Sequence, residues 1–227
     1  CIRDAGQTAL IIGASRGIGF ELARQYRAGG WRVLASVRRP ADAAALETLG
    51  CIVLQLDLND AAHCVALGER LATEQLDIAL LNAGVYGPLT GAPETPSSHE
   101  FDAVMHANVL GAMRVLPLLG PLVASAGGRL GVISSSMGSI SLRTNTRGWL
   151  YRASKAALNS LLVDASLSYA PAICVALHPG WVRTAMGGDG ADLDVAESAS
   201  GMRATLAGLR AADNGHFFNY NGAPLSW

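Results

Sequence analysis

The chain has 227 residues, of which 50% are hydrophobic and 15% charged, and its formal net charge is −1. This composition excludes a disordered chain and is typical of one compact domain, here residues 1–227, in which helices cover a buried sheet. A net charge near zero gives no basis for binding nucleic acid or a membrane surface, so neither is expected as a partner.

Cysteine usage and the lengths of apolar runs bear on the cellular compartment. The four cysteines, Cys1, Cys51, Cys64 and Cys174, are scattered, and no Cys/His cluster has metal-ligand spacing. Buried, reduced thiols and no metal are therefore expected, as in a cytoplasmic protein. No apolar run approaches the roughly 18 to 20 residues that span a bilayer, and no signal peptide is visible.

Apolar runs typical of buried strands alternate along the chain with helical patterns. The expected strands are 8–12, 31–36, 51–56, 77–81, 129–134, 172–177 and 216–220. The expected helices are 17–28, 40–50, 60–75, 98–119, 149–169 and 194–209, with Pro117 and Pro121 disturbing the end of the fourth. This order predicts an α/β fold in which right-handed βαβ units close one doubly wound parallel sheet of about seven strands, with helices on both faces.

Three glycines follow the first expected strand, at the point where the first helical pattern begins. Gly13, Gly17 and Gly19 allow a tight turn and let a ligand approach the backbone closely. The N–H groups of the first helical turn, together with the positive end of the helix dipole, attract a phosphate. Glycine-rich turns also serve as plain connectors, but this position in an alternating chain indicates a nucleotide-binding turn.

The charges beside this turn predict which dinucleotide binds. Arg38 and Arg39 follow the second strand, where a carboxylate would otherwise hold a ribose 2′-hydroxyl, and Arg16 stands near the positive end of the first helix. Arg16 and Arg38, with no acid after the second strand, suit the 2′-phosphate of NADP(H) and therefore favour that cofactor. The alternative for Arg38 is an ordinary solvated arginine.

A tyrosine and a lysine stand four residues apart at the start of the helix expected at 149–169. Tyr151 and Lys155 therefore project from one face, where an ammonium could lower the pKa of the phenol. Such a pair usually marks only a helix surface. Ser135, just after the fifth strand, supplies a hydroxyl that could donate to a substrate carbonyl beside Tyr151, and Ser134 and Ser136 are its competitors.

Together these motifs resemble the short-chain dehydrogenase/reductase family, whose members have a Rossmann-type sheet. The likeness covers Gly-x3-Gly-x-Gly at 13–19, Asn-Ala-Gly at 82–84, Ile-Ser-Ser at 133–135, Tyr-x3-Lys at 151–155 and Pro-Gly at 179–180. Ile12 and Leu81 depart from the family's usual Thr and Asn but leave the binding backbone intact.

Within the family, four features resemble the sniffer and C-factor type of carbonyl reductase. These are the gap of sixteen residues from Ser135 to Tyr151, Met-Gly-Ser-Ile at 137–140, the stretch 178–188 and the ending 218–227.

The resemblance implies a catalytic set of Asn108, Ser135, Tyr151 and Lys155. Ser135 would orient and polarise a carbonyl oxygen, Tyr151 would protonate it, and Lys155 would lower the pKa of Tyr151 while binding the nicotinamide ribose. Asn108 would hold a water that relays protons to the lysine, although a mid-helix Asn is otherwise a tolerated polar residue. The family pattern selects Ser135 as the serine of the motif.

The resemblance also implies the contacts of the cofactor. Asp57 would accept a hydrogen bond from the adenine amino group, but alone it could equally cap a turn. His178 is a tempting base to which the family assigns no role. The expected cofactor-binding residues are Gly13, Ser15, Arg16, Gly17, Ile18, Gly19, Arg38, Asp57, Leu58, Asn82, Ala83, Gly84, Tyr151, Lys155, Pro179, Gly180, Val182 and Thr184.

The expected function is that of an oxidoreductase moving hydride between NADP(H) and a small, apolar carbonyl or alcohol substrate. The alternative is a dinucleotide-binding signalling or sensor protein with little turnover, which the C-factor resemblance suggests. A glycine-rich loop at about 185–194 is expected to cover the substrate.

The expected pocket lining is mostly apolar, so an uncharged carbonyl compound should react better than a sugar or a dicarboxylate. The expected lining is Val85, Tyr86, Met137, Leu142, Trp149, Trp181 and Met186, with Arg143, Arg147 and Arg183 as nearby cations.

The helices expected at 98–119 and 149–169 are predicted to pair in a homodimer or tetramer, as members of the family commonly do. The second helix has more apolar positions than one core-facing stripe requires, namely Leu158, Leu161, Leu162, Ala165 and Leu167. The alternative is that both faces are covered within one chain.

Overall fold

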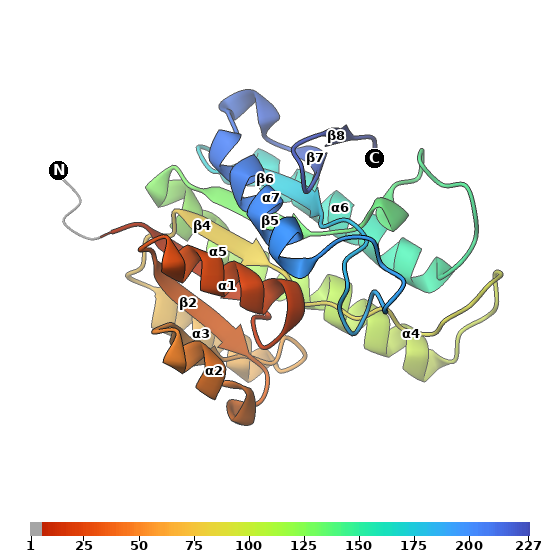
Figure 1. Ribbon diagram of the computed structural model, residues 1–227, viewed down its shortest axis with the longest axis horizontal. Helices are drawn as coiled ribbons and strands as arrows, with labels where there is room; N and C mark the ends of the chain where they lie inside the picture. Colours follow the sequence, from red (N-terminus) through yellow and green to blue (C-terminus); the bar gives the residue numbers. More distant parts are fainter. Residues whose placement is uncertain (1–5) are drawn as a thin grey trace.

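A computed structural model describes residues 6–227. Within them, one sheet has the strand order β3-β2-β1-β4-β5-β6-β7-β8 (Figure 1). The strands are β1 Thr8–Ile12, β2 Arg32–Val37, β3 Ile52–Gln55, β4 Ile78–Leu81, β5 Arg129–Ile133, β6 Ile173–His178, β7 His216–Asn219 and β8 Pro224–Leu225. All neighbouring pairs are parallel except β7 and β8. The predicted doubly wound sheet is confirmed, with β8 as an added antiparallel strand.

Helical segments connect the strands. They are α1 Gly17–Ala28, η1 Pro40–Asp42, α2 Ala44–Thr48, α3 Ala61–Leu71, α4 Ser98–Met105, η2 His106–Leu110, α5 Gly111–Ala126, η3 Ser136–Gly138, α6 Trp149–Ser168, α7 Val195–Gly208 and η4 Ala211–Asp213. Side-chain caps explain several starts: Asp60 caps α3, Ser97 forms a capping box with Glu100 at α4, and Asp194 caps α7.

The helix expected at 98–119 is longer than predicted, because Pro117 and Pro121 lie inside α5 rather than at its end. Each proline removes one backbone hydrogen bond. Burial of Val115, Leu119 and Val123 against the sheet offsets that cost, and the helix ends only before Gly127, whose φ is +59°. The expectation that Pro117 and Pro121 disturb the end of this helix was therefore wrong.

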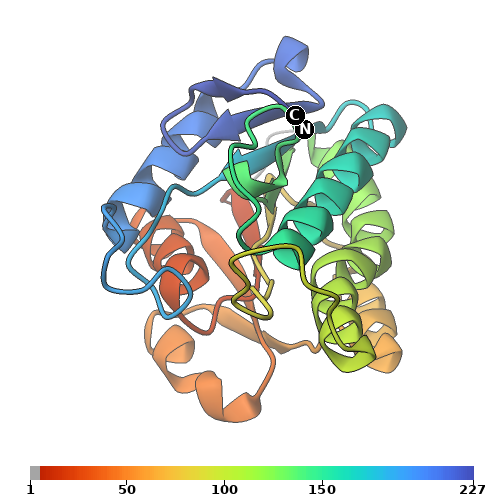
Figure 2. The same cartoon turned by 90° about the vertical axis from the view of Figure 1, so that its right-hand side faces the viewer.

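Two apolar layers sandwich the sheet. Figure 2 shows α1 (red) and α7 (blue) on one side and α5 and α6 (green to teal) on the other. Leu22, Ala199 and Met202 belong to the first core, whereas Leu119 and Leu162 belong to the second. Because both faces are covered, the middle of each central strand is apolar, and polar groups lie at or near the strand ends.

The continuous helical segment Ser98–Ala126 is long and apolar enough to cross a membrane by length and composition. The expectation that no segment would meet this criterion was wrong. In the fold the segment is a core helix, since Val104, Ala112, Val115 and Leu119 are buried against the rest of the protein.

Burial also decides the state of the described cysteines. Cys51, Cys64 and Cys174 are free and buried, and burial raises the pKa of each thiol, that of Cys174 to about 11. These three are therefore protonated side chains of the core, as predicted. Cys1 lies outside the described residues.

Candidate active site

The glycine turn after β1 has no room for side chains. Gly13 has a φ of +84°, and a Cβ there would lie 2.9 Å from the backbone of Ala83. A Cβ on Gly19 would lie 2.1 Å from the Gly13 carbonyl oxygen. Gly17 also has a positive φ, of +55°. The turn consequently presents backbone, with Ser15 and Ile18 half-buried within it.

Side chains from two neighbouring strands hold this turn in place. The Gly13 N–H donates to Ser36 Oγ at 2.9 Å, and Asn82 Nδ2 donates to the Gly13 carbonyl at 2.8 Å. Ser36 is 2% exposed at the end of β2. Sequence reasoning missed Ser36, although a lone hydroxyl in an apolar strand beside a glycine turn was an available signal.

The arginines after β2 have different partners. Arg39 forms a two-bond ion pair with Asp42, at 3.0 and 2.9 Å, and the pKa of Asp42 is lowered chiefly by that bond. Within residues 6–227, the side chains of Arg16 and Arg38 are exposed and make no hydrogen bond, but their charges also lower the pKa of Asp42. These two predicted cations are therefore close together, and the nearest acid already has a partner.

Asp57 follows β3 and has the turn role that the sequence left open. Its Oδ1 accepts from the Asn59 N–H at 2.9 Å, as in an Asx turn. Leu58, which follows it, is buried against α5, where a Cβ on Gly111 would lie 2.9 Å from the Leu58 side chain.

The three serines after β5 have separate surroundings. Ser134 is 2% exposed and donates to Asn159 Oδ1 of α6, so its hydroxyl proton is used within the fold. Ser136 begins the η3 turn. Ser135 Oγ accepts from the Met137 N–H at 3.1 Å, and the Ser135 hydroxyl is near enough to Tyr151 to act against the rise in the pKa of its phenol. Of the three serines, Ser135 is the one whose hydroxyl acts on Tyr151, and its catalytic role stays a prediction.

Tyr151 is a buried phenol at the start of α6. Its ring stacks on Tyr86 from the loop after β4, with centroids 4.6 Å apart and planes 22° apart. Burial raises the pKa of Tyr151 to about 12, against a lowering hydrogen bond from Ser135, and the nearby Tyr86 raises it further. The expected lowering of this pKa is therefore wrong for this structure, because desolvation outweighs every attraction for the phenolate.

Lys155 lies one helical turn beyond Tyr151, and its side chain is buried in the interior. Nζ donates to the Ile133 carbonyl at 2.8 Å and lies 5.7 Å from the centre of the Tyr151 ring. Burial lowers the pKa of Lys155 to about 8. The four-residue spacing brings the two side chains together as predicted.

Asn108 lies in the π-helical turn η2 and is 2% exposed. Its Oδ1 accepts from the Val85 N–H, and its Nδ2 donates to the Val85 carbonyl and to Ser154 Oγ, at 2.8, 2.8 and 2.9 Å. A Cβ on Gly84 would lie 3.1 Å from Asn108 Oδ1 and 3.3 Å from Lys155 Nζ. The amide therefore fixes the loop after β4 close to the lysine.

The segment after β6 folds back over the glycine turn. Val182 bridges to Leu193, and a Cβ on Gly17 would lie 3.4 Å from the Thr184 side chain. Thr184 Oγ1 accepts from the Gly187 N–H at 3.1 Å. Gly180 has a φ of +85°. These contacts bring the segment of the predicted lid to the same edge of the sheet as the glycine turn.

His178 ends β6 as a half-buried side chain, and its buried Nδ1 has no hydrogen-bond partner among residues 6–227. Burial lowers its pKa to about 4, so the ring is neutral at neutral pH. The neighbouring Pro179 carbonyl accepts from Ser198 Oγ at 2.6 Å, which ties this corner to α7. Nothing in these contacts directs His178 toward Tyr151.

Comparison with known proteins places this arrangement in a family. The family model described as short chain dehydrogenase matches residues 7–192. C-signal of Myxococcus xanthus is 34% identical over 165 residues, which are 71% of this chain and 99% of that protein.

Solved structures agree with this assignment. A carbonyl reductase from Pseudomonas aeruginosa PAO1 in complex with NADP superimposes with a TM-score of 0.86 at 35% identity, covering 98% of this chain and 100% of that one. Carbonyl reductase Sniffer of D. melanogaster has a TM-score of 0.84 at 27% identity, with the same coverage. The chain belongs to the short-chain dehydrogenase family of oxidoreductases. Its likeness to C-signal and Sniffer confirms the resemblance to the sniffer and C-factor type.

Proposed function

We propose that the protein is an NADP(H)-dependent enzyme that interconverts a carbonyl compound and its alcohol. The observation that carries this proposal is the buried group of Ser135, Tyr151 and Lys155, joined to Asn108 around Gly84. Ala83 links that group to the glycine turn, since it lies against Gly13. A proton-holding phenol beside a dinucleotide-binding turn suits hydride transfer better than any other chemistry.

The residues of the sheet edge fit a dinucleotide phosphate. In the described chain, Arg16 makes no side-chain cap on α1, and the first turn of α1 contains no acidic residue. The backbone N–H groups of the first turn of α1 therefore suit a phosphate. Arg16 and Arg38 suit the 2′-phosphate of NADP(H), because Asp42 is already paired with Arg39. The NADP complex of the Pseudomonas relative supports the same choice.

The proposed roles follow from protonation states. When bound, NADPH would supply a hydride for the carbonyl carbon. Tyr151, whose pKa of about 12 keeps it protonated at neutral pH, donates its proton to the oxygen, because an alkoxide is a stronger base than a phenolate. Ser135 donates to the same oxygen and orients it. Lys155, whose pKa is lowered to about 8, exchanges protons in the neutral range and can reprotonate the phenolate.

Asn108 is a positioning residue in this scheme. Both ends of its amide are used by Val85 and Ser154, so its side chain holds the loop after β4 rather than reaching a substrate. The water relay to Lys155 then depends on the backbone of η2, where the π-helical turn interrupts the regular ladder.

The carbonyl end of the substrate is proposed to be small and apolar. Tyr86 and Met137 lie beside Tyr151, and Leu142, Trp149, Trp181 and Met186 are at least 39% exposed apolar side chains on the surrounding loops. The segment at about 185–194 is proposed to close over the substrate, within a single domain formed by the whole chain.

Self-association through α4, α5 and α6 and a cytoplasmic location stay predictions. Most of the apolar surplus expected on α6 is used by the chain itself, since Leu158, Leu162 and Ala165 are buried in the core. The apolar side chains left on these helices include Phe101, Met113 and Leu167, which are 47, 53 and 80% exposed. Light scattering at working concentration decides between a dimer and a monomer.

A panel of aldehydes and ketones tests the proposed enzyme. Oxidation of NADPH, followed by the nicotinamide absorbance, should depend on the carbonyl compound and on Tyr151. NADPH binding without carbonyl-dependent oxidation across the panel would instead favour the sensor alternative, which the likeness to C-signal suggests.

A further inference from the structure

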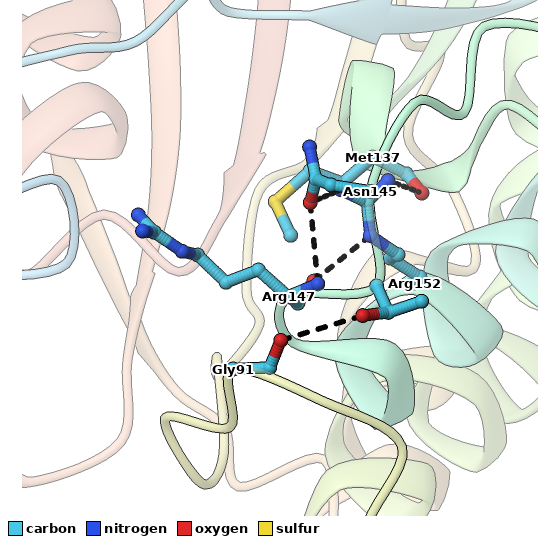
Figure 3. A pocket seen from close by; sticks show the side chains of 6 residues that line it. Gly91, Met137, Asn145, Arg147 and Arg152 are labelled. Carbon is cyan, nitrogen blue, oxygen red and sulfur yellow. Dashed lines mark hydrogen bonds between the residues drawn. The ribbon is translucent and has the colours of Figure 1, made fainter.

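A pocket with a volume of about 740 Å³ lies against the η3 turn and the first turn of α6. It is lined by Gly91, Met137, Asn145, Thr146, Arg147 and Arg152 (Figure 3). Met137 is shared with the catalytic segment, because its N–H donates to Ser135 Oγ. Arg152 directly follows Tyr151 in α6. The pocket is therefore lined by the same two segments that carry Ser135 and Tyr151.

Arg152 is a buried guanidinium that is held only by neutral oxygens. The residue is 6% exposed, its Nε donates to the Arg147 carbonyl and its Nη2 to Asn145 Oδ1, both at 2.8 Å. Nη1 is 3.5 Å from the Met137 carbonyl. Three of the five N–H donors are thus used, and two are left. A guanidinium that has no counter-charge, and that keeps two donors at the wall of a pocket, suits an anionic ligand.

The charged residues that line the pocket, Arg147 and Arg152, have the same sign. Arg147 stands at the rim, and Figure 3 shows its side chain extending away from Arg152. Arg143 is close enough that its charge contributes to lowering the pKa of Arg152. The N-terminus of α6, whose first turn contains no acidic residue, adds positive potential. Among the described residues, no carboxylate lies within 4 Å of the three guanidinium groups.

We infer that this pocket binds a carboxylate at the far end of the carbonyl substrate. The planar guanidinium fork of Arg152 matches the two oxygens of a carboxylate, and Arg143 and Arg147 strengthen the attraction. Met137 lines the pocket and lies, like Tyr86, against Gly148, and Tyr86 in turn stacks on Tyr151. The substrate class is then an oxo acid with an apolar middle, which changes the expectation of an uncharged substrate.

This inference rests on the proposed function, and matched substrates test it. The compounds are 3- and 4-carboxybenzaldehyde, each compared with its methyl ester, which has the same aldehyde without the charge. In at least one pair the acid should have a kcat/KM about tenfold to a hundredfold higher, as expected for hydrogen bonds to a charged group. Arg152→Gln should reduce that ratio to about one.

Further variants separate anion binding from support of the loop. If Arg152 only holds residues 145–147, Arg152→Gln lowers kcat/KM for acid and ester alike, and the inference is wrong. The exposed pair Arg143→Gln/Arg147→Gln should lower the acid-to-ester ratio without unfolding the loop, and Arg70→Gln on α3 should leave it unchanged.

Binding without turnover separates this inference from the proposed function. Esters reduced as fast as acids would overturn the carboxylate pocket and leave the reductase intact. If neither is reduced, calorimetry with 4-methylbenzoate and the neutral 4-methylbenzamide still decides. The pocket is supported if the benzoate binds at least about tenfold more tightly than the benzamide and if Arg152→Gln abolishes that binding. Equal binding of the two compounds contradicts it.

Discussion

The glycine turn at residues 13–19 acts through backbone and available space, whereas the segment from Ser135 to Lys155 acts through buried side chains. A Cβ on Gly19 would lie 2.1 Å from a carbonyl oxygen, so any larger residue disrupts the turn itself. In the second region, burial raises the pKa of Tyr151 to about 12 and lowers that of Lys155 to about 8. The glycine turn therefore depends on the absence of side chains, whereas the segment from Ser135 to Lys155 depends on the exclusion of water.

The difference has a physical basis in the sheet. Both regions lie at the ends of parallel strands, but the turn leads directly into α1, while Tyr151 is carried by α6 against a loop from β4. Substitutions in the two regions should accordingly fail in different ways, by lost binding in the first and lost turnover in the second.

Removal of the Tyr151 hydroxyl should have the largest effect on turnover. Tyr151→Phe keeps the ring and its stacking on Tyr86 but removes the proposed proton donor, so turnover falls by at least about two orders of magnitude. Steady-state kinetics with any active carbonyl compound measures this loss, and NADPH binding by fluorescence should be unchanged.

Tyr26→Phe is the matched control for that variant. Tyr26 is also a buried phenol whose pKa burial raises to about 12, but it lies in α1 beside Arg203, away from the proposed chemistry. Its turnover should stay within about twofold of the parent, well below the loss expected for a proton donor. A similar loss in both variants would mean that burial of a phenol, and not its position, explains the effect.

Gly19→Ala should break the other region. The added methyl group pushes the turn away from Gly13 and Asn82, which lowers the free energy of unfolding by about 1–3 kcal/mol and weakens NADPH binding at least about tenfold. Urea unfolding and a cofactor titration measure the two effects. Gly208→Ala, at the end of α7 with no atom within 4 Å of the added Cβ, should leave both unchanged. Normal NADPH affinity in Gly19→Ala would remove the turn from cofactor binding.

The pH dependence of stability tests whether burial acts on a third group at this edge. His178 has a pKa lowered to about 4 from 6.5, so the unfolded chain binds more protons between these values. Stability is therefore complete above about pH 6.5 and is lost as pH falls toward 4, by up to about 3 kcal/mol. Urea unfolding of the parent and of His178→Gln across this window should differ in slope. The exposed His99→Gln should follow the parent, and a parent without any such slope would contradict the burial of a neutral His178.

The smallest effect concerns the exposed charges that flank the turn. The parent should bind NADPH at least about tenfold more tightly than NADH, because charge-assisted bonds to a phosphate are worth about 1.5–3 kcal/mol each. Arg38→Ala should narrow this preference mainly by weakening NADPH binding, as measured by paired titrations. Equal affinities of the parent for both cofactors would defeat the assignment, since Arg38 would then be an ordinary solvated arginine.

Local patterns in the sequence by themselves determined the order of strands and helices. The run at 8–12 with its three glycines coincides with β1 and the start of α1, because β-branched runs and positive-φ glycines act within a few residues. The spacing of Tyr151 and Lys155 likewise followed from helix geometry alone. Short-range regularity sufficed for these features, including their place at the carboxyl edge of a parallel sheet.

Only the tertiary structure decided which side chains are desolvated and which hydroxyls are used in hydrogen bonds within the fold. Asn159, distant in sequence, uses the hydroxyl of Ser134 and leaves Ser135 for Tyr151. Packing of Tyr86 over Tyr151 and burial of the site reversed the expected direction of the phenol's pKa. Burial of α5 carried a helix through two prolines. Each outcome depends on atoms brought together from separate loops and elements, and desolvation acts through that proximity rather than through any pattern along the chain.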